Sequence, residues 1–206
     1  AFKPIILKAM DAEKFQSAFK RLYSRQDIFE LTLAEQDEAP EGWQTLRWLE
    51  KGNTNASTVI LKVCNPYCGH CNTAHRIFNE ILKENDNVKI VTIYGINDNE
   101  IDNERRLPVQ HFLALQEQAE SLPEGKNYQK LYQAMDYWYL TPNRNYESLQ
   151  QQYPVDVVLF EKQKTKVAAM KDWYKAALIE YTPTVYVNGK KLPSMFNLED
   201  LKDVFI

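Results

Sequence analysis

The pattern of apolar residues predicts a strand, a helix and a second strand in the middle of the chain. Residues 58–63 (TVILKV) are apolar or β-branched apart from Lys62, which is typical of a strand buried on both faces. Residues 88–94 alternate apolar and polar side chains and continue to Ile96 as a second strand. Between them, one helical face carries Cys71, Ala74, Ile77, Phe78, Ile81 and Leu82. Short joins between these elements predict a right-handed βαβ unit with parallel strands.

The C-terminal residues predict a hairpin followed by a helix. Residues 184–187 (TVYV) form a strand pattern, and Asn188-Gly189 is typical of a type I′ turn. Residues 190–193 then predict a short edge strand. The last helix is expected to begin at Asn197 as its N-cap, with its apolar side chains buried: Leu198, Leu201 and Phe205.

The remaining chain is predicted to be mostly helical. Residues 97–180 contain several helical faces, and we expect them to be separated by prolines: Pro108, Pro123, Pro142 and Pro154. In residues 1–56 a helical face carries Phe15, Ala18, Phe19 and Leu22. We expect this N-terminal segment to be mostly helical and to pack on the core.

Composition limits the classes of function. The chain has 206 residues, of which 44% are hydrophobic, enough for a substantial core. Its formal net charge of -3 offers no basic surface for nucleic acid, which we therefore exclude as a partner. No stretch approaches the roughly 20 apolar residues of a membrane-spanning helix. The three cysteines, Cys64, Cys68 and Cys71, lie too close together to serve as structural staples, so they indicate reactivity or metal binding.

The motif Cys68-Gly69-His70-Cys71 stands where the first strand meets the helix. Free backbone N–H groups at a helix start stabilise a thiolate on the first cysteine. We expect Cys68 to attack a disulfide and Cys71, one turn inside, to resolve the mixed disulfide. Gly69 and His70 tune the pair. His70 is expected to add positive charge and a hydrogen bond to the Cys68 thiolate, which would favour the reduced form. The alternative is half of a zinc site, but no second C-x-x-C motif completes it.

A second feature supports redox chemistry. Thr182-Pro183-Thr184 begins the third predicted strand, where a proline cannot donate a hydrogen bond to the sheet. The alternative is an ordinary proline at a strand edge.

Together, the dithiol motif and Thr182-Pro183 before a hairpin and a terminal helix resemble the thioredoxin superfamily. The resemblance implies an α/β thioredoxin fold, with a central mixed sheet flanked by helices and formed by residues 57–96 and 181–206. Residues 97–180 would be a helical insertion of the DsbA-like kind. It also implies a cis Thr182–Pro183 bond facing the dithiol, where Thr182, Pro183 and Tyr67 would bind substrate. No cofactor beyond the Cys68–Cys71 disulfide is implied, and no metal.

Several further motifs resemble the C-terminal thioredoxin domain of bacterial vitamin K epoxide reductase-like fusion proteins, some of which carry a peptidase C39 domain. They are Asn65-Pro66-Tyr67-Cys68-x-x-Cys71-x-x-x-His75, residues 182–189, Leu192-Pro193 and residues 198–201. The resemblance implies a periplasmic or extracytoplasmic domain that exchanges disulfides with protein substrates. It also implies a membrane vitamin K epoxide reductase-like redox partner, which the same full-length chain could contain.

The sequence departs from the superfamily pattern near the dithiol. Lys62 stands where thioredoxins keep a buried acid, six residues before the first active cysteine. Lys62 either stabilises the thiolate or extends to solvent at the strand edge. Cys64 is expected to behave as a small buried hydrophobe, and His75 as a packed or rim residue rather than a catalytic one.

A metal-binding module is the alternative function. Cys64-x-x-x-Cys68 is a spacing used by copper-delivery members of this fold. With His70, Cys71 and His75, the cluster offers ligands for a soft cation such as Cu(I).

Overall fold

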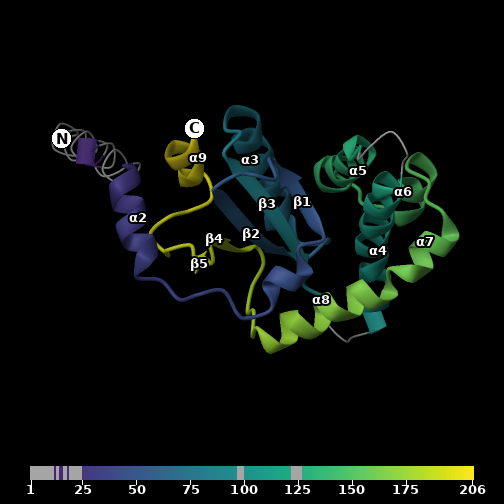
Figure 1. Cartoon of the computed structure of the whole chain (residues 1–206). Coiled ribbons are helices and arrows are strands. Elements are labelled where there is room, and N and C mark those ends of the chain that lie inside the picture. The colour runs from purple at the N-terminus through teal and green to yellow at the C-terminus, as the bar shows by residue number, and fades with distance from the viewer. Residues whose placement is uncertain (1–11, 13, 16–17, 19–24, 97–99, 122–126) are drawn as a thin grey trace, which may run out of the picture.

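A five-stranded mixed sheet forms the centre of the protein (Figure 1). The computed structural model describes residues 12, 14–15, 18, 25–96, 100–121 and 127–206. In spatial order the strands are β1 (Leu49–Gly52), β3 (Val88–Tyr94), β2 (Thr58–Cys64), β4 (Thr184–Val187) and β5 (Lys190–Lys191). Strands β2 and β3 are parallel, and the other pairs are antiparallel. The predicted βαβ unit and thioredoxin fold are therefore present.

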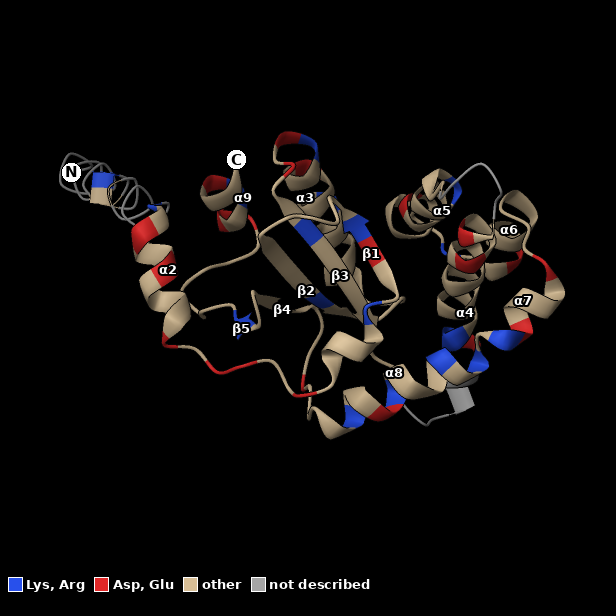
Figure 2. Ribbon diagram, in the orientation of Figure 1, with Lys and Arg blue, Asp and Glu red and all other residues tan. Residues whose placement is uncertain are grey.

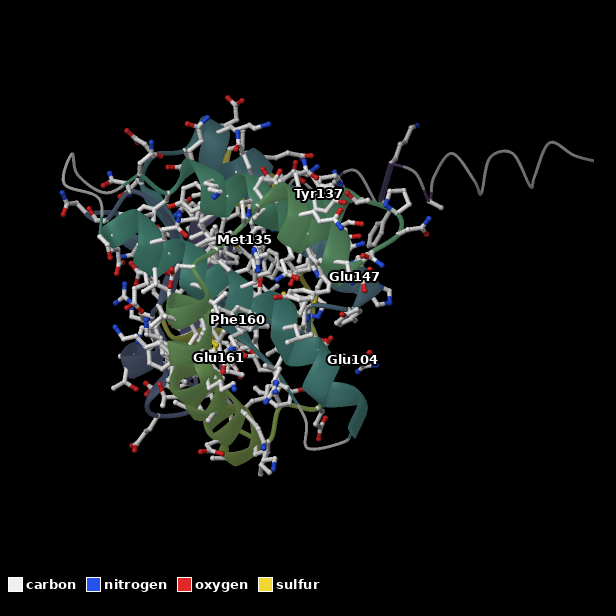
Figure 3. All side chains as sticks on the ribbon, turned by 90° about the vertical axis from the view of Figure 1, so that its right-hand side faces the viewer. Glu104, Met135, Tyr137, Glu147, Phe160 and Glu161 are labelled. Atoms are coloured by element: carbon white, nitrogen blue, oxygen red, sulfur yellow. The ribbon has the colours of Figure 1, made fainter. Side chains whose placement is uncertain are left out.

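Helices cover both faces of the sheet (Figure 1). One layer contains α2 (Gln26–Ala34), α3 (Gly69–Glu84) and α9 (Asp200–Phe205), whose apolar side chains share a core with Ile60. The other layer is the predicted helical insertion, which packs on Leu61 and Val63. It consists of α4 (Glu100–Glu120), α5 (Gln129–Leu140), α6 (Tyr146–Gln152), α7 (Val157–Lys162) and α8 (Lys164–Ala176). Figure 3 looks onto this layer, with Met135 of α5 and Phe160 of α7 labelled.

Strand β3 is buried on both faces. Its sequence alternates apolar and polar residues, yet every residue of β3 is buried, including Lys89 and Thr92. The insertion covers one face and α3 covers the other, so the side chains on both faces of β3 are shielded from solvent. The strand also ends at Tyr94 rather than Ile96.

The N-terminal segment contributes a strand that its sequence pattern did not predict. After α2 and the short 3-10 helix η1 (Trp43–Leu46), residues 49–52 pair with β3 as an edge strand. The predicted helical face that includes Phe19 and Leu22 lies largely outside the described residues. Pairing with a distant strand creates β1, and such pairing leaves only a weak local signal in so short a segment.

Two predicted helix boundaries were wrong. Pro108 lies inside α4 instead of separating two helices. The last helix begins at Asp200, while the Asn197 side chain accepts hydrogen bonds from the N–H groups of Glu199 and Asp200 just before it. Pro142 and Pro154 do follow the ends of α5 and α6, and Pro123 is outside the described residues. In the hairpin, Asn188 and Gly189 both have positive φ, as a type I′ turn requires.

Acidic and basic residues are intermixed over the helices, and both signs occur along α7 and α8 (Figure 2). In the part of the chain that the structure describes, no helix combines the length and apolar character needed to cross a bilayer.

Candidate active site

The dithiol lies at the turn from β2 into α3. Strand β2 ends at Cys64, and Cys68 is the N-cap of α3 with an extended backbone. The turn between them is closed by the Cys68 N–H, which donates to the Asn65 carbonyl at 3.1 Å. The Asn65 side chain also accepts from the Tyr67 N–H at 2.8 Å. This local bonding holds Cys68 at the positive end of the helix.

The Cys68 thiol faces a cis proline. The Thr182–Pro183 peptide bond is cis, as the family resemblance implied. The half-buried Cys68 thiol donates a hydrogen bond to the Thr182 carbonyl, with Sγ and oxygen 3.2 Å apart. Residues far apart in the sequence therefore meet directly at the first cysteine of the motif.

Cys71 lies beneath Cys68 and is completely buried. All three cysteines are free thiols in this structure. The Cys71 thiol makes hydrogen-bond contacts with Cys64, with Cys68 and with the backbone of Asn65. The hydrogen bond to Cys64, together with burial, raises the pKa of Cys71 well above its usual value. The second thiol of the pair is thus protonated and screened from solvent.

Gly69 and His70 occupy the exposed side of the motif. A Cβ at Gly69 would meet no atom within 4 Å, so this position faces open space. His70 is exposed, and among the described contacts no hydrogen bond joins it to Cys68, unlike the expectation from the sequence. Its side chain instead lines a groove beside the dithiol.

The groove has a volume of about 580 Å³ and runs along the cis proline. Its walls come from the start of α3, from the segment around Pro183 and from the chain between β5 and α9. Its lining includes His70, Thr73, Thr182, Pro183, Leu192 and Phe196. A groove of this size beside a half-buried thiol accommodates an extended segment of polypeptide.

Tyr67 does not line this groove. Its ring makes an edge-to-face contact with Trp138 of α5, with centroids 5.3 Å apart. The Arg105 guanidinium of α4 lies 5.8 Å from the Tyr67 ring centroid. Tyr67 therefore connects the active-site turn to the helical insertion.

Two residues that the sequence pattern does not mark hold the turn from the insertion side. Trp138 Nε1 donates to the Pro66 carbonyl at 2.7 Å, and Arg144 donates to the same carbonyl at 2.8 Å. Arg144 also donates to the Cys68 carbonyl at 3.3 Å and to the Asn72 side chain. No local signal marks Arg144, because its role depends on how the loop after α5 packs against α3.

Lys62 is not at a strand edge, which corrects one of the two expectations for it. Strand β2 is central, with Lys62 opposite Thr92 on one side and Val185 on the other. Its side chain is only 2% exposed, and Nζ lies 5.6 Å from the Tyr139 ring centroid and 6.0 Å from that of Phe78. A buried cation stabilised by aromatic faces replaces the acid of thioredoxins.

His75 is packed rather than exposed at the rim. It is 3% exposed, stacks on Tyr139 and hydrogen-bonds through Nε2 to Asp136 at 2.6 Å. Burial, aided by the charges of Lys62 and Lys51, lowers the pKa of His75 to about 4 despite this bond. His75 is thus a neutral structural residue at pH 7.

The Cu(I) alternative finds no geometric support. Within the described residues, no group of three or more His, Cys, Asp or Glu side chains is arranged to hold a metal ion. His70 lines the groove and His75 hydrogen-bonds to Asp136, and neither is part of such a group with the three thiols.

The sheet, the C-x-x-C motif at the start of α3 and the cis proline opposite it define a thioredoxin-fold protein with a helical insertion. The chain belongs to the thioredoxin family, which it matches over residues 46–205. No curated protein matches the sequence.

Solved structures share this fold at low sequence identity. ScsC from Proteus mirabilis, in a compact conformation, is 10% identical with a TM-score of 0.62, covering 99% of this chain and 94% of that one. A periplasmic thioredoxin-like protein from Salmonella enterica serovar Typhimurium is 11% identical, with a TM-score of 0.61 and coverages of 82% and 97%. The thiol-disulfide exchange protein alpha-DsbA2 from Wolbachia pipientis is 11% identical, with a TM-score of 0.56 and coverages of 90% and 95%. These likenesses support the DsbA-like arrangement of the fold.

Proposed function

We propose that the protein is a thiol-disulfide oxidoreductase that exchanges disulfides with protein substrates through Cys68 and Cys71. The observation that carries this proposal is the half-buried Cys68 thiol at the start of α3, 3.2 Å from the carbonyl beside the cis Pro183. An attacking sulfur, a buried second sulfur and a backbone edge for substrate are the parts that disulfide exchange needs.

In the reducing direction, the Cys68 thiolate attacks one sulfur of a substrate disulfide. A Cys68–substrate disulfide forms, and the second substrate sulfur leaves as a thiolate. Cys71, after losing its proton, attacks Cys68 Sγ, releases the substrate and leaves the Cys68–Cys71 disulfide. The oxidising direction runs through the same steps in reverse, so the dithiol itself is the redox group and no further cofactor takes part.

The groove supports a polypeptide as the substrate. Thr182 and Pro183 line it next to Cys68, and apolar side chains such as Leu192 and Phe196 continue the wall. An extended segment could hydrogen-bond to the Thr182 backbone while its own sulfur meets Cys68. His70 and Gly69 border the approaching chain and tune the thiolate from the solvent side.

We further propose a location outside the cytoplasm and a membrane redox partner of the vitamin K epoxide reductase-like kind. The location is supported by the periplasmic relative from Salmonella enterica and the partner by the motif resemblance. Such a partner would oxidise or reduce the Cys68–Cys71 pair after each round of exchange.

The test is the reduction of insulin disulfides, or the oxidation of a dithiol peptide, by the purified chain. Cys68→Ala should abolish activity, because the other two thiols, Cys64 and Cys71, are completely buried. Cys71→Ala should retain attack but accumulate a covalent Cys68–substrate adduct visible by mass spectrometry. Full activity of the Cys68→Ala variant would refute the proposal.

A further inference from the structure

The three sulfurs of this protein form a row with Cys71 in the middle. Cys64 and Cys71 are both completely buried, and Cys68 is half-buried at the surface. The Cys71 thiol has hydrogen-bond contacts with both of the other thiols. A resolving cysteine between two thiols has a choice of disulfide partners, which the two-cysteine mechanism leaves unused.

The local fold brings Cys64 under the first turn of α3. The Gly95 N–H donates to the Cys64 carbonyl at 2.7 Å and anchors the end of β2. The turn that starts at Asn65 then reverses the chain, and the Asn65 backbone contacts the Cys71 thiol. The Cys71 side chain is thus in contact with both the Cys64 and the Cys68 side chain, and contact between two thiols is the first requirement for a disulfide between them.

Lys62 provides a reason for Cys64 to be reactive. The two residues lie two positions apart on β2, so their side chains share a face of the sheet. Burial raises the pKa of Cys64, but the hydrogen bond from Cys71 and the charge of Lys62 more than offset it, so the pKa lies below its usual value. The buried Lys62 charge thus favours the thiolate at Cys64.

We propose that Cys64 is a third redox-active cysteine. It forms a disulfide with Cys71 in place of Cys68, so that Cys68 becomes a free thiol while the chain keeps one disulfide. The inference rests on the proposed exchange through Cys68 and Cys71. Lys62 acts as a positioning residue that stabilises the attacking sulfur.

The step is an internal rearrangement without net oxidation. The Cys64 thiolate attacks Cys71 Sγ, the Cys64–Cys71 bond forms, and the Cys68–Cys71 bond breaks. The electron pair of the broken bond goes to Cys68 Sγ, and the proton lost by Cys64 passes to Cys68 or to solvent. No external oxidant or reductant is required.

This rearrangement adds disulfide isomerisation to simple oxidation. With Cys71 bound to Cys64, the free Cys68 thiolate attacks a substrate disulfide and forms a mixed disulfide that Cys71 does not resolve. A thiolate from a further cysteine of the substrate, other than the one just released, then attacks the substrate sulfur in the mixed disulfide and releases Cys68. The substrate leaves with a different pairing and the same number of disulfides.

Maleimide labelling of the folded, oxidised chain tests the inference. After oxidation with oxidised glutathione and removal of the reagent, N-ethylmaleimide should modify Cys68 in the wild type, because that thiol is free only in the Cys64–Cys71 form. Cleavage after Tyr67 separates Cys64 from the other two cysteines for mass spectrometry. Oxidised wild type that takes up no label at Cys68 would overturn the inference.

The matched control is Cys64→Ser, treated in the same way. On oxidation, both remaining thiols of this variant should enter the Cys68–Cys71 disulfide, because Cys68 then has only Cys71 as a partner. The oxidised variant should therefore take up no label. Label on Cys68 of this oxidised variant would contradict the assigned role of Cys64. Failure of this variant to form any disulfide would instead refute the proposed Cys68–Cys71 exchange itself.

Lys62 is tested by the rate and pH dependence of labelling. Lys62→Met, which keeps an apolar stem, should slow the labelling of oxidised protein several-fold and shift its pH profile upwards. Lys62→Arg keeps the charge and should restore most of the rate. Equal rates and pH profiles for the Met variant and the wild type would show that Lys62 takes no part in the rearrangement.

Discussion

At the scale of single residues, the buried polar groups behind the dithiol distinguish this protein from an ordinary apolar core. Lys62 rests on the rings of Tyr139 and Phe78, and His75 stacks on the same Tyr139. Asn79 bridges to the Asp136 side chain at 2.8 Å, and Lys51 donates to Asn79 at 2.7 Å. Buried charge and neutral imidazole therefore coexist because each has aromatic or hydrogen-bonding neighbours.

His75 makes folding stability depend on pH. Its pKa is about 4 in the folded state and near 6.5 in a free side chain, so the unfolded chain binds the proton first as the pH falls. The stabilisation is complete above pH 6.5 and is lost as the pH drops towards 4. We expect the free energy of unfolding to fall by on the order of 3 kcal/mol over this window. Urea unfolding at a series of pH values measures this change in the free energy of unfolding.

The control for this prediction is His75→Gln, which keeps a polar side chain but does not titrate. Its unfolding free energy should vary less between pH 6.5 and 4 than that of the wild type. Parallel pH profiles for the two proteins would show that His75 is not the titrating group.

At the scale of elements, the turn between β2 and α3 is held from two directions. The sheet fixes its start at Cys64, and the insertion fixes its middle through Trp138 and Arg144. The loop after α5 thus determines the position of the Cys68 backbone, although it lies far along the chain. The insertion supports the site directly as well as covering the sheet.

Arg144→Met should loosen this turn. The change removes donors to the Pro66 and Cys68 carbonyls, and we expect a loss of about 2 kcal/mol in stability. Disulfide exchange should slow several-fold, because Cys68 would no longer be held against Thr182. Stopped-flow kinetics with a disulfide peptide measures the rate.

Arg76→Met serves as the matched control, because Arg76 pairs with Glu80 and Glu199 on the exposed side of α3. Its exchange rate should equal that of the wild type. If the Arg144 and Arg76 variants exchange at the same rate, the insertion loop does not position the dithiol.

At the scale of the whole molecule, the sheet depends on both helical layers. Leu61, Val63, Val91 and Ile93 face the insertion and are 0% exposed, as is Tyr94. Without α4, α5 and α8, these side chains would form a broad apolar surface exposed to solvent. The insertion is therefore part of the folding unit and not an appended lid.

Replacing residues 97–180 by a short flexible linker should abolish cooperative folding. The exposed apolar face would give a compact state that binds the dye ANS and lacks near-UV circular dichroism. The full chain provides the reference, with a single sharp unfolding transition. A cooperative transition of the shortened chain, without dye binding, would show that the sheet is stable alone.

The sequence by itself determined the elements whose cause is local. The β-branched run of β2, the helical spacing after Cys71 and the Asn188-Gly189 turn were sufficient to predict those elements and the position of the dithiol at a helix start. Propensity, periodicity and turn geometry act over a few residues, so a single sequence carries them.

Only the tertiary structure decided what depends on distant contacts. Three such features join separate parts of the chain: the pairing of β1 with β3, the burial of Lys62 in the central strand, and the hydrogen bonds from Arg144 to the active-site turn. The contact of Cys71 with Cys64 also needs the folded turn, which converts a spacing along the chain into a row of sulfurs. Such contacts are set by how whole layers pack, and no short stretch of sequence encodes that packing.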